Sequence, residues 1–166
     1  TMLRWMPRSS APEGPTLLDR LLRARGFETP VDVEAFLNPS RAHLGDPFKM
    51  PNMGMAVERI LRAKAEGRAV VVYGDYDVDG VTATALITLF LEKFGVRARR
   101  YIPSRHREGY GLNEEALRSI AEEGDHPLLI TVDCGVTAVK EIELAKELGL
   151  DPIVTDHHHL GETLPD

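Results

Sequence analysis

Strand and helix patterns alternate from residue 69 onward, and this alternation limits the possible folds more than any other feature. Short apolar runs rich in β-branched residues predict strands at residues 69–73, 128–132 and 152–155, and a more exposed strand is expected at residues 98–102. Helical patterns lie between them, at residues 81–95, 113–124 and 138–149. Strands joined by helices in this way form a parallel sheet covered on both faces. The predicted fold class is therefore α/β, a parallel sheet with helices on both faces.

The first third of the chain has a helical pattern instead. Apolar residues recur at helical spacing in 17–27, and a second helix is expected to begin at Thr29–Pro30 and to stop at Asn38–Pro39. A third amphipathic helix is predicted at 55–67. We therefore expect a helical N-terminal segment and linker at residues 1–53, followed by the α/β core at residues 54–166.

Composition narrows the class of protein further. The formal net charge of −6 is unlike the basic face of most nucleic-acid-binding domains, although bound divalent cations would offset part of it. The single cysteine, Cys134, excludes an internal disulfide and favours a reducing, cytoplasmic location. No apolar run is long enough to span a bilayer, and no secretory leader is expected. The helix at 81–95 is expected to pack in the core, and no membrane partner is predicted.

Acidic and imidazole side chains follow three of the four predicted strands. They are Asp75, Asp77 and Asp79 after the first strand, Asp133 after the third, and Asp156, His157, His158 and His159 after the fourth. In an open parallel sheet the carboxyl ends of the strands line one edge, where ligands bind. Three separate segments are therefore expected to bring these groups together at one edge.

The stretch GDYDVDG, residues 74–80, permits three interpretations. A calcium loop starting at Asp75 would place Gly80 correctly, but its twelfth position is Leu86, where a bidentate Glu is required. A haloacid-dehalogenase-like phosphatase would use Asp77 as the nucleophile and Asp79 as the general acid, which leaves Asp75 and the DHHH cluster without a role.

The third interpretation is a two-metal hydrolytic site. Two divalent cations can activate a water molecule and stabilise the leaving oxygen of a phosphodiester. Asp133, alone at a strand end, is well placed to bridge them. A mixed set of carboxylate and imidazole ligands favours two Mn²⁺ ions, with Mg²⁺ as the alternative.

The same residues carry a family resemblance. GDYDVDGVTA, TVDCG and TDHHH together resemble the first three motifs of the DHH phosphoesterase superfamily. Within it the chain is most similar to the RecJ single-strand-specific exonucleases, because LLRARGFETPVDVEAFLNP, LGDPFKMPNMGMAVERI and YIPSRHREGYGLN also resemble those sequences. The resemblance extends from about residue 17 to the end.

The resemblance implies specific roles for the clustered residues. The implied metal ligands are Asp77, Asp79, Asp133 and His157, and the implied catalytic residues are Asp75, Asp156 and His158. The pyrophosphatase branch has a His where this chain has Tyr73, so one metal must be completed differently, and Asp75 is the candidate.

Other residues remain open between functional and ordinary interpretations. Arg105 is predicted to hold a DNA phosphate and Tyr110 to stack on a base, although both also fit a plain loop. His106 is expected to be a solvated loop residue and Cys134 a packed one.

The function implied by the resemblance is metal-dependent 5′-to-3′ exonucleolytic hydrolysis of single-stranded DNA in repair and recombination. The implied partners are single-stranded DNA, a RecQ-type helicase and a single-stranded-DNA-binding protein. RecJ enzymes use a further Asp and a second domain beyond the three motifs, so the core is expected to be incomplete at its C-terminus and inactive alone. A non-catalytic DHH relative acting as a replication or binding factor is the alternative of a different class.

Overall fold

The computed structural model describes residues 14, 16–105, 109–124 and 126–166. These residues fall into two compact units, one ending at Lys49 and the other running from Met50 to Asp166. The division predicted from the sequence lies four residues further along, after residue 53, and stays a prediction of the domain boundary. Each unit is described separately below.

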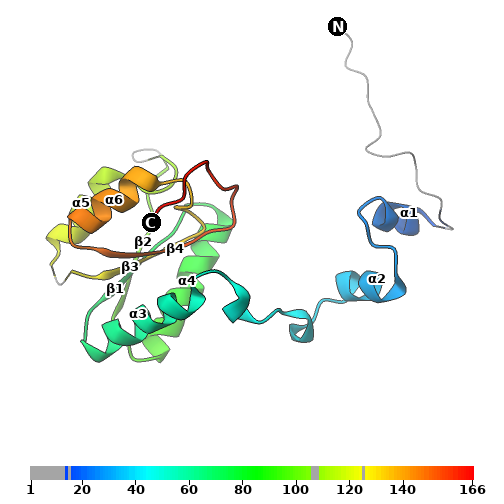
Figure 1. Cartoon of the computed structure of the whole chain (residues 1–166), viewed down its shortest axis with the longest axis horizontal. Helices are drawn as coiled ribbons and strands as arrows, with labels where there is room; N and C mark the ends of the chain where they lie inside the picture. The colour runs from blue at the N-terminus through cyan, green and yellow to red at the C-terminus, as the bar shows by residue number, and fades with distance from the viewer. Residues whose placement is uncertain (1–13, 15, 106–108, 125) are drawn as a thin grey trace, which may run out of the picture. The chain divides into compact units, whose positions relative to one another are not determined.

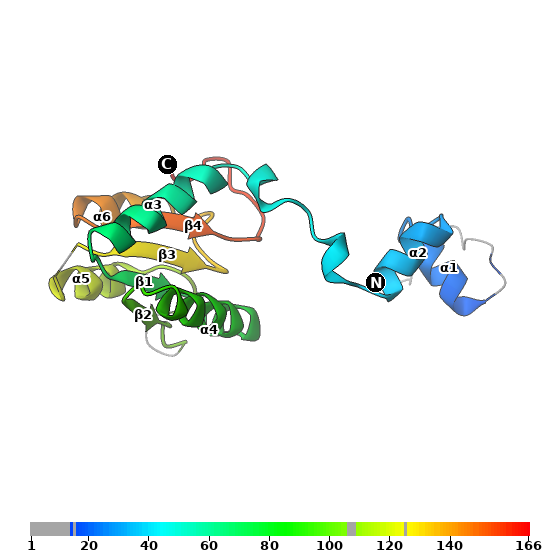
Figure 2. The same ribbon diagram turned by 90° about the horizontal axis from the view of Figure 1, so that it is seen from below.

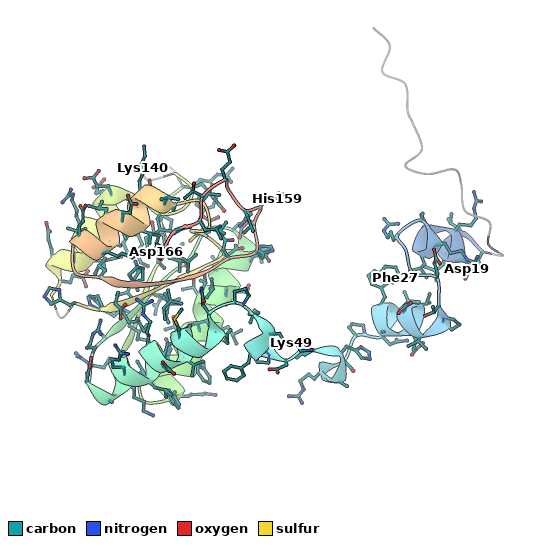
Figure 3. All side chains as sticks on the ribbon, in the orientation of Figure 1. Asp19, Phe27, Lys49, Lys140, His159 and Asp166 are labelled. Carbon is teal, nitrogen blue, oxygen red and sulfur yellow. The ribbon has the colours of Figure 1, made fainter. Side chains whose placement is uncertain are left out.

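The first unit contains two short helices whose starts follow from their capping residues. Helix α1 (Leu17–Arg23) begins after Thr16, and helix α2 (Pro30–Leu37) begins after Thr29 with Pro30 in its first turn. The Phe27 and Phe36 rings lie 4.3 Å apart, centroid to centroid. Figure 3 labels Phe27 in this unit. Two short 3₁₀ helices, η1 (Arg41–His43) and η2 (Pro47–Lys49), occupy the predicted linker.

The second unit contains the predicted alternation of strands and helices. In chain order its elements are α3 (Met53–Ala65), β1 (Val70–Tyr73), α4 (Val78–Lys93), β2 (Ala98–Tyr101), α5 (Glu114–Glu122), β3 (Leu128–Val132), α6 (Val139–Glu147) and β4 (Asp151–Thr155). The predicted α/β class, preceded by a helical segment, is confirmed.

The four strands form one parallel sheet in the order β2-β1-β3-β4. Figure 2 shows this order across the sheet. Tyr73 at the end of β1 pairs with Thr131 of β3, and Thr155 at the end of β4 pairs with Val132. The carboxyl ends of these three strands therefore lie at the same edge of the sheet.

Alternate residues of β1 point to opposite faces of the sheet. Val70 and Val72 pack with Ala63 of α3 and Leu91 of α4, whereas Val71 and Tyr73 pack on the face covered by α5 and α6. Figure 1 shows the two helical layers on either side of the strands. This packing fixes the register that brings the strand ends together.

Helix α4 turns its small and hydroxyl-bearing residues toward the sheet. Its buried positions are Gly80, Thr84, Thr88 and Leu91. Leu86, Leu89 and Phe90 are exposed, Leu86 by 69%. The predicted core packing therefore holds for one face of α4 only. Among the described residues, no helix is long and apolar enough to cross a membrane.

Candidate metal centre

The loop between β1 and α4 folds tightly enough to bury Asp75. This residue is 1% exposed, and its Oδ1 atom is buried with no hydrogen-bond partner among the described residues. A Cβ atom added at Gly80 would lie 2.5 Å from the backbone N and O of Asp75, and one at Gly74 would lie 2.0 Å from Thr84 Oγ1. Two glycines therefore allow the loop to lie directly on the first turn of α4.

Asp77 is the N-cap of α4. Its Oδ1 accepts hydrogen bonds from Asp79 N at 2.9 Å and from Gly80 N at 3.0 Å. The hydrogen bond from Gly80 N is the largest cause that lowers the pKa of the Asp77 carboxyl. Asp79 lies in the first turn of the same helix. The sequence placed these acids in a loop, whereas Asp79 belongs to the helix.

Asp133 follows β3 with an unusual backbone conformation. Its φ of +63° lies in the left-handed region, which Asp and Asn tolerate better than most residues with side chains. The residue is 8% exposed, and its Oδ2 is buried with no partner among the described residues. Burial, followed by the negative charge of Asp77, raises the pKa of the Asp133 carboxyl. Burial and a like charge therefore oppose the ionised form of this carboxylate, and a contact with His157 offsets only part of that effect.

Asp156 connects the loops that follow β3 and β4. Its Oδ2 accepts a hydrogen bond from Val136 N at 2.9 Å, and its Oδ1 accepts from His157 N, His158 N and His158 Nδ1 at 2.7, 3.1 and 2.7 Å. Burial alone would raise the pKa of the Asp156 carboxyl, but these hydrogen bonds outweigh it and lower the pKa. The carboxylate is thus occupied by protein donors, and it orients His158.

The two imidazoles next to Asp156 point toward the end of β3. His157 Nε2 lies 2.9 Å from Asp133 Oδ1. The hydrogen bond to Asp156 is the largest cause that raises the pKa of the His158 ring. One ligand atom from each of Asp133, His157 and His158 can lie within 4.8 Å of the others. Figure 3 labels His159 on the segment that follows β4.

An aromatic side chain from a distant loop completes the border of this cluster. Tyr110 is 54% exposed, and its hydroxyl oxygen lies 3.3 Å from His158 Nδ1. The Tyr110 and Tyr76 rings meet edge to face at 6.4 Å, and the Arg105 guanidinium carbon lies 5.3 Å from the Tyr76 ring centroid. Sequence reasoning missed Tyr76, and its place between Asp75 and Asp77 was the available signal. His106 lies outside the described residues.

Cys134 is packed below this edge. The thiol is fully buried, and its Sγ lies 3.9 Å from Tyr73 O, which accepts a weak hydrogen bond. Burial is the main cause that raises the pKa of the thiol to about 12. The burial of the side chain confirms the prediction of a packed cysteine. A thiol that stays protonated is also a poor nucleophile.

The structure thus brings most of the predicted acidic and imidazole side chains to one edge of the sheet, with the closest contacts around Asp133. Asp133 and His157 are in direct contact, and His158 lies next to them. Asp77 is close enough to raise the pKa of the Asp133 carboxyl. Carboxylate oxygens and imidazole nitrogens are suitable donors for a divalent cation such as Mn²⁺. The partnerless buried oxygens of Asp75 and Asp133 fit such a cation, because buried anionic oxygens are costly unless paired or bound to metal. A strand, β1, precedes the GDYDVDG loop, where a calcium loop of the EF-hand type has a helix.

Comparison with known proteins gives this geometry a context. The family model described as "DHH family, N-terminal domain" matches residues 69–166. The single-stranded-DNA-specific exonuclease RecJ of Bacillus subtilis (strain 168) is 48% identical over 150 residues, which cover 90% of this chain and 19% of the relative. The chain spans about a fifth to a quarter of the length of these curated relatives, which include the RecJ exonuclease of Dickeya dadantii (strain 3937).

Two solved structures resemble the fold. A manganese-bound RecJ exonuclease has a TM-score of 0.62 and 39% identity, with 68% of this chain and 29% of that chain covered. RecJ from Thermus thermophilus in complex with Mn²⁺ has a TM-score of 0.65 and 33% identity, with 87% of this chain and 19% of that chain covered. The family model covers more than half of the chain, including every acidic and imidazole residue of the cluster. The chain therefore belongs to the DHH family.

Proposed function

We propose that this chain takes part in metal-dependent hydrolysis of phosphodiester bonds in single-stranded DNA, as a 5′-to-3′ exonuclease of repair and recombination. The observation that carries the proposal is a pair of buried carboxylate oxygens, on Asp75 and Asp133, that have no partner among the described residues, together with the two imidazoles next to Asp133. The similarity to single-stranded-DNA-specific exonucleases supports the choice of substrate.

The residues proposed to hold two metal ions are Asp77, Asp79, Asp133 and His157, and of these Asp133 and His157 are in contact. Mn²⁺ is the preferred ion and Mg²⁺ the alternative, because the donor set mixes carboxylate and imidazole and because similar structures contain manganese. When bound, such ions would neutralise the clustered charge and acidify a water molecule.

The proposed catalytic residues Asp75, Asp156 and His158 differ in their work. Asp156 holds His158 through Nδ1, and Nε2, 3.4 Å from the Tyr110 hydroxyl, is proposed to face a phosphate oxygen. The raised pKa of the His158 ring favours its charged form, which would stabilise a phosphate anion. Asp75 lies too deep to contact a long substrate, and we assign it to support of the metal site.

Two side chains at the border are proposed to bind the DNA strand. Arg105 can contact a phosphate bidentately, and Tyr110 presents an exposed ring for stacking. A cytoplasmic location, a RecQ-type helicase and a single-stranded-DNA-binding protein are proposed as the setting and partners of the reaction, from the family alone.

The test combines metal binding by this chain with cleavage by a chimera. Calorimetry of the chain with MnCl₂ should show binding that Asp133→Asn weakens by at least about 10-fold. In the chimera, residues 17–166 replace the equivalent part of the B. subtilis exonuclease. We expect Mn²⁺-dependent release of 5′-labelled nucleotides from a single strand, but not from a blunt duplex.

Two variants of the chimera make the result specific. Asp133→Asn should lower the cleavage rate by about 100-fold or more, whereas Cys134→Ser should retain most of it. A chimera that binds Mn²⁺ and DNA but never cleaves would instead favour the non-catalytic binding role. A dead Cys134→Ser chimera that still folds and binds Mn²⁺ would favour a thiol nucleophile.

A further inference from the structure

Tyr73 connects the metal-bearing strand end to a loop nearly forty residues away. It is the last residue of β1 and is fully buried on the face covered by α5 and α6. Its hydroxyl donates a hydrogen bond to Gly111 O at 3.0 Å and accepts one from Asn113 Nδ2 at 3.1 Å. A buried phenol with two partners holds those partners in place, because losing either bond leaves a polar group unpaired.

The loop that receives these hydrogen bonds has a backbone that needs support. Gly109 and Gly111 have φ values of +79° and +77°, so two left-handed residues flank Tyr110. On the other side, Asn113 caps α5 by accepting a hydrogen bond from Ala116 N at 2.8 Å. The Asn113 amide therefore joins the start of α5 to Tyr73. Among the described side chains, Tyr73 and Asn113 anchor this loop through the hydrogen bonds of the Tyr73 hydroxyl.

The anchored loop presents Tyr110 to the metal centre. The Tyr110 ring meets the His158 ring edge to face at 5.9 Å, and its hydroxyl lies 3.3 Å from His158 Nδ1. Glycines on both sides leave the Tyr110 backbone with many alternative conformations. A fixed position for Tyr110 therefore requires an anchor outside the loop, and the Tyr73 hydroxyl supplies one.

We propose that Tyr73 is a positioning residue that holds Tyr110 over His158 through Gly111 and Asn113. This inference rests on the proposed function, in which Tyr110 contacts the DNA strand. The Tyr73 ring also stacks on Tyr101, with centroids 5.1 Å apart, and this stacking belongs to the core. The positioning role belongs to the hydroxyl alone, so Tyr73→Phe separates the two.

The first measurement is spectroscopic and needs no DNA. In the unaltered chain, NMR should show a nuclear Overhauser effect between the Tyr110 and His158 rings. Tyr73→Phe should lose this signal and keep the one between the rings at positions 73 and 101, which reports the fold. Persistence of the Tyr110–His158 signal in Tyr73→Phe would overturn the proposal.

The second measurement is a double-mutant cycle on the affinity of the chimera for a fluorescent single strand of DNA, at low salt in MnCl₂. Tyr73→Phe should weaken binding by about 3–10-fold, the loss expected for a hydrogen-bond network. In a Tyr110→Ala background the same substitution should change affinity by less than about 2-fold, because the residue it positions is gone. Equal losses in both backgrounds would show that Tyr73 does not act through Tyr110, and would also overturn the proposal.

A third measurement separates positioning from damage to the metal centre. The Mn²⁺ affinity of Tyr73→Phe should equal that of the unaltered chain, and a clear loss of it would count against a role confined to the loop. If the unaltered chimera binds no single-stranded DNA in MnCl₂, the proposed function fails. The NMR comparison then decides the positioning role alone.

Discussion

His157 Nε2 lies 2.9 Å from Asp133 Oδ1, so the loop after β4 reaches back to the end of β3. The two residues are 24 positions apart in the sequence, and they meet because β3 and β4 are parallel neighbours. Asp133 is buried and His157 is exposed, so the contact joins the inside of the domain to its surface. A cation bound here would have one buried ligand, Asp133, and one ligand exposed to solvent, His157.

Replacing Asp133 by Asn should stabilise the metal-free chain and abolish its stabilisation by Mn²⁺. The folded state raises the pKa of this carboxyl, so its ionised form destabilises the fold above that pKa, and the penalty disappears as pH falls. Calorimetry at pH 7 with chelator should therefore give a higher Tm for Asp133→Asn. MnCl₂ should raise the Tm of the unaltered chain only.

Asn suits this experiment because it tolerates the left-handed backbone, whereas Ala would add strain at φ +63°. The exposed Glu143 on α6 provides a matched control. Like Asp133→Asn, Glu143→Gln removes one negative charge, but it lies outside the cluster. MnCl₂ should therefore raise its Tm as much as it raises that of the unaltered chain. An equal response by Asp133→Asn would contradict the proposed ligand role.

Replacing Asp156 by Asn should loosen the junction between two loops. An Asn side chain has one acceptor oxygen, so it cannot accept from Val136 N and from the His158 side at the same time. The expected loss of unfolding free energy is about 1–3 kcal/mol, from one part-buried donor left unpaired. Urea unfolding measures it. Asp166→Asn, which alters only an exposed ion pair with Lys146, should change stability by less than about 1 kcal/mol.

Two glycine substitutions should have opposite effects. Gly80→Ala would place a Cβ atom 2.5 Å from the Asp75 backbone, and overpacking of this kind costs about 1–3 kcal/mol. Gly54 lies in α3 with no atom within 4 Å of an added Cβ, so Gly54→Ala should stabilise the chain by about 0.5–1 kcal/mol. Thermal unfolding of both variants decides the matter, and a harmless Gly80→Ala would contradict the close approach of the loop to α4.

The Cys134 thiol should resist alkylation in the folded chain. Its pKa is raised to about 12, so almost no thiolate is present at pH 8 to 10. Mass spectrometry after iodoacetamide treatment should show slow modification without urea and rapid modification with it. Because the ordinary thiol pKa is 9.0, the unfolded chain loses its proton first, and folding stability should fall as pH rises from about 9 toward 12. Rapid native alkylation at pH 8 would contradict the burial of the thiol.

β1 and β3 were predictable because their apolar runs are buried on both faces of a covered parallel sheet. β3 has the predicted bounds, 128–132. α4 begins at Val78 rather than at residue 81, because the Asp77 side chain caps it, and sequence reasoning had considered that acid for chemistry and not for capping. When one residue is both a helix cap and a candidate ligand, the start of the helix is harder to predict from the sequence.

The arrangement within the site was less predictable, because it depends on contacts between distant residues. The parallel arrangement of the strands was enough to expect Asp133 and the DHHH cluster at the same edge of the sheet. The four donors around Asp156 and the left-handed backbone at Asp133 arise from loop geometry that no local pattern encodes. The contact of Tyr110 with His158 spans 48 positions and depends on a buried hydroxyl in β1.

The left-handed turn at Asp133 narrows the evolutionary options at this position. Gly, Asn and Asp are the residues that accept such a backbone readily, and of these only Asp carries a charge. Glu would keep the charge, but it lacks the short side chain that eases this conformation. A lineage that drifts from Asp to Asn therefore keeps its fold and loses its anion in one step. On the proposed ligand role of Asp133, descendants with Asn at this position should stay well folded but lose Mn²⁺-dependent activity.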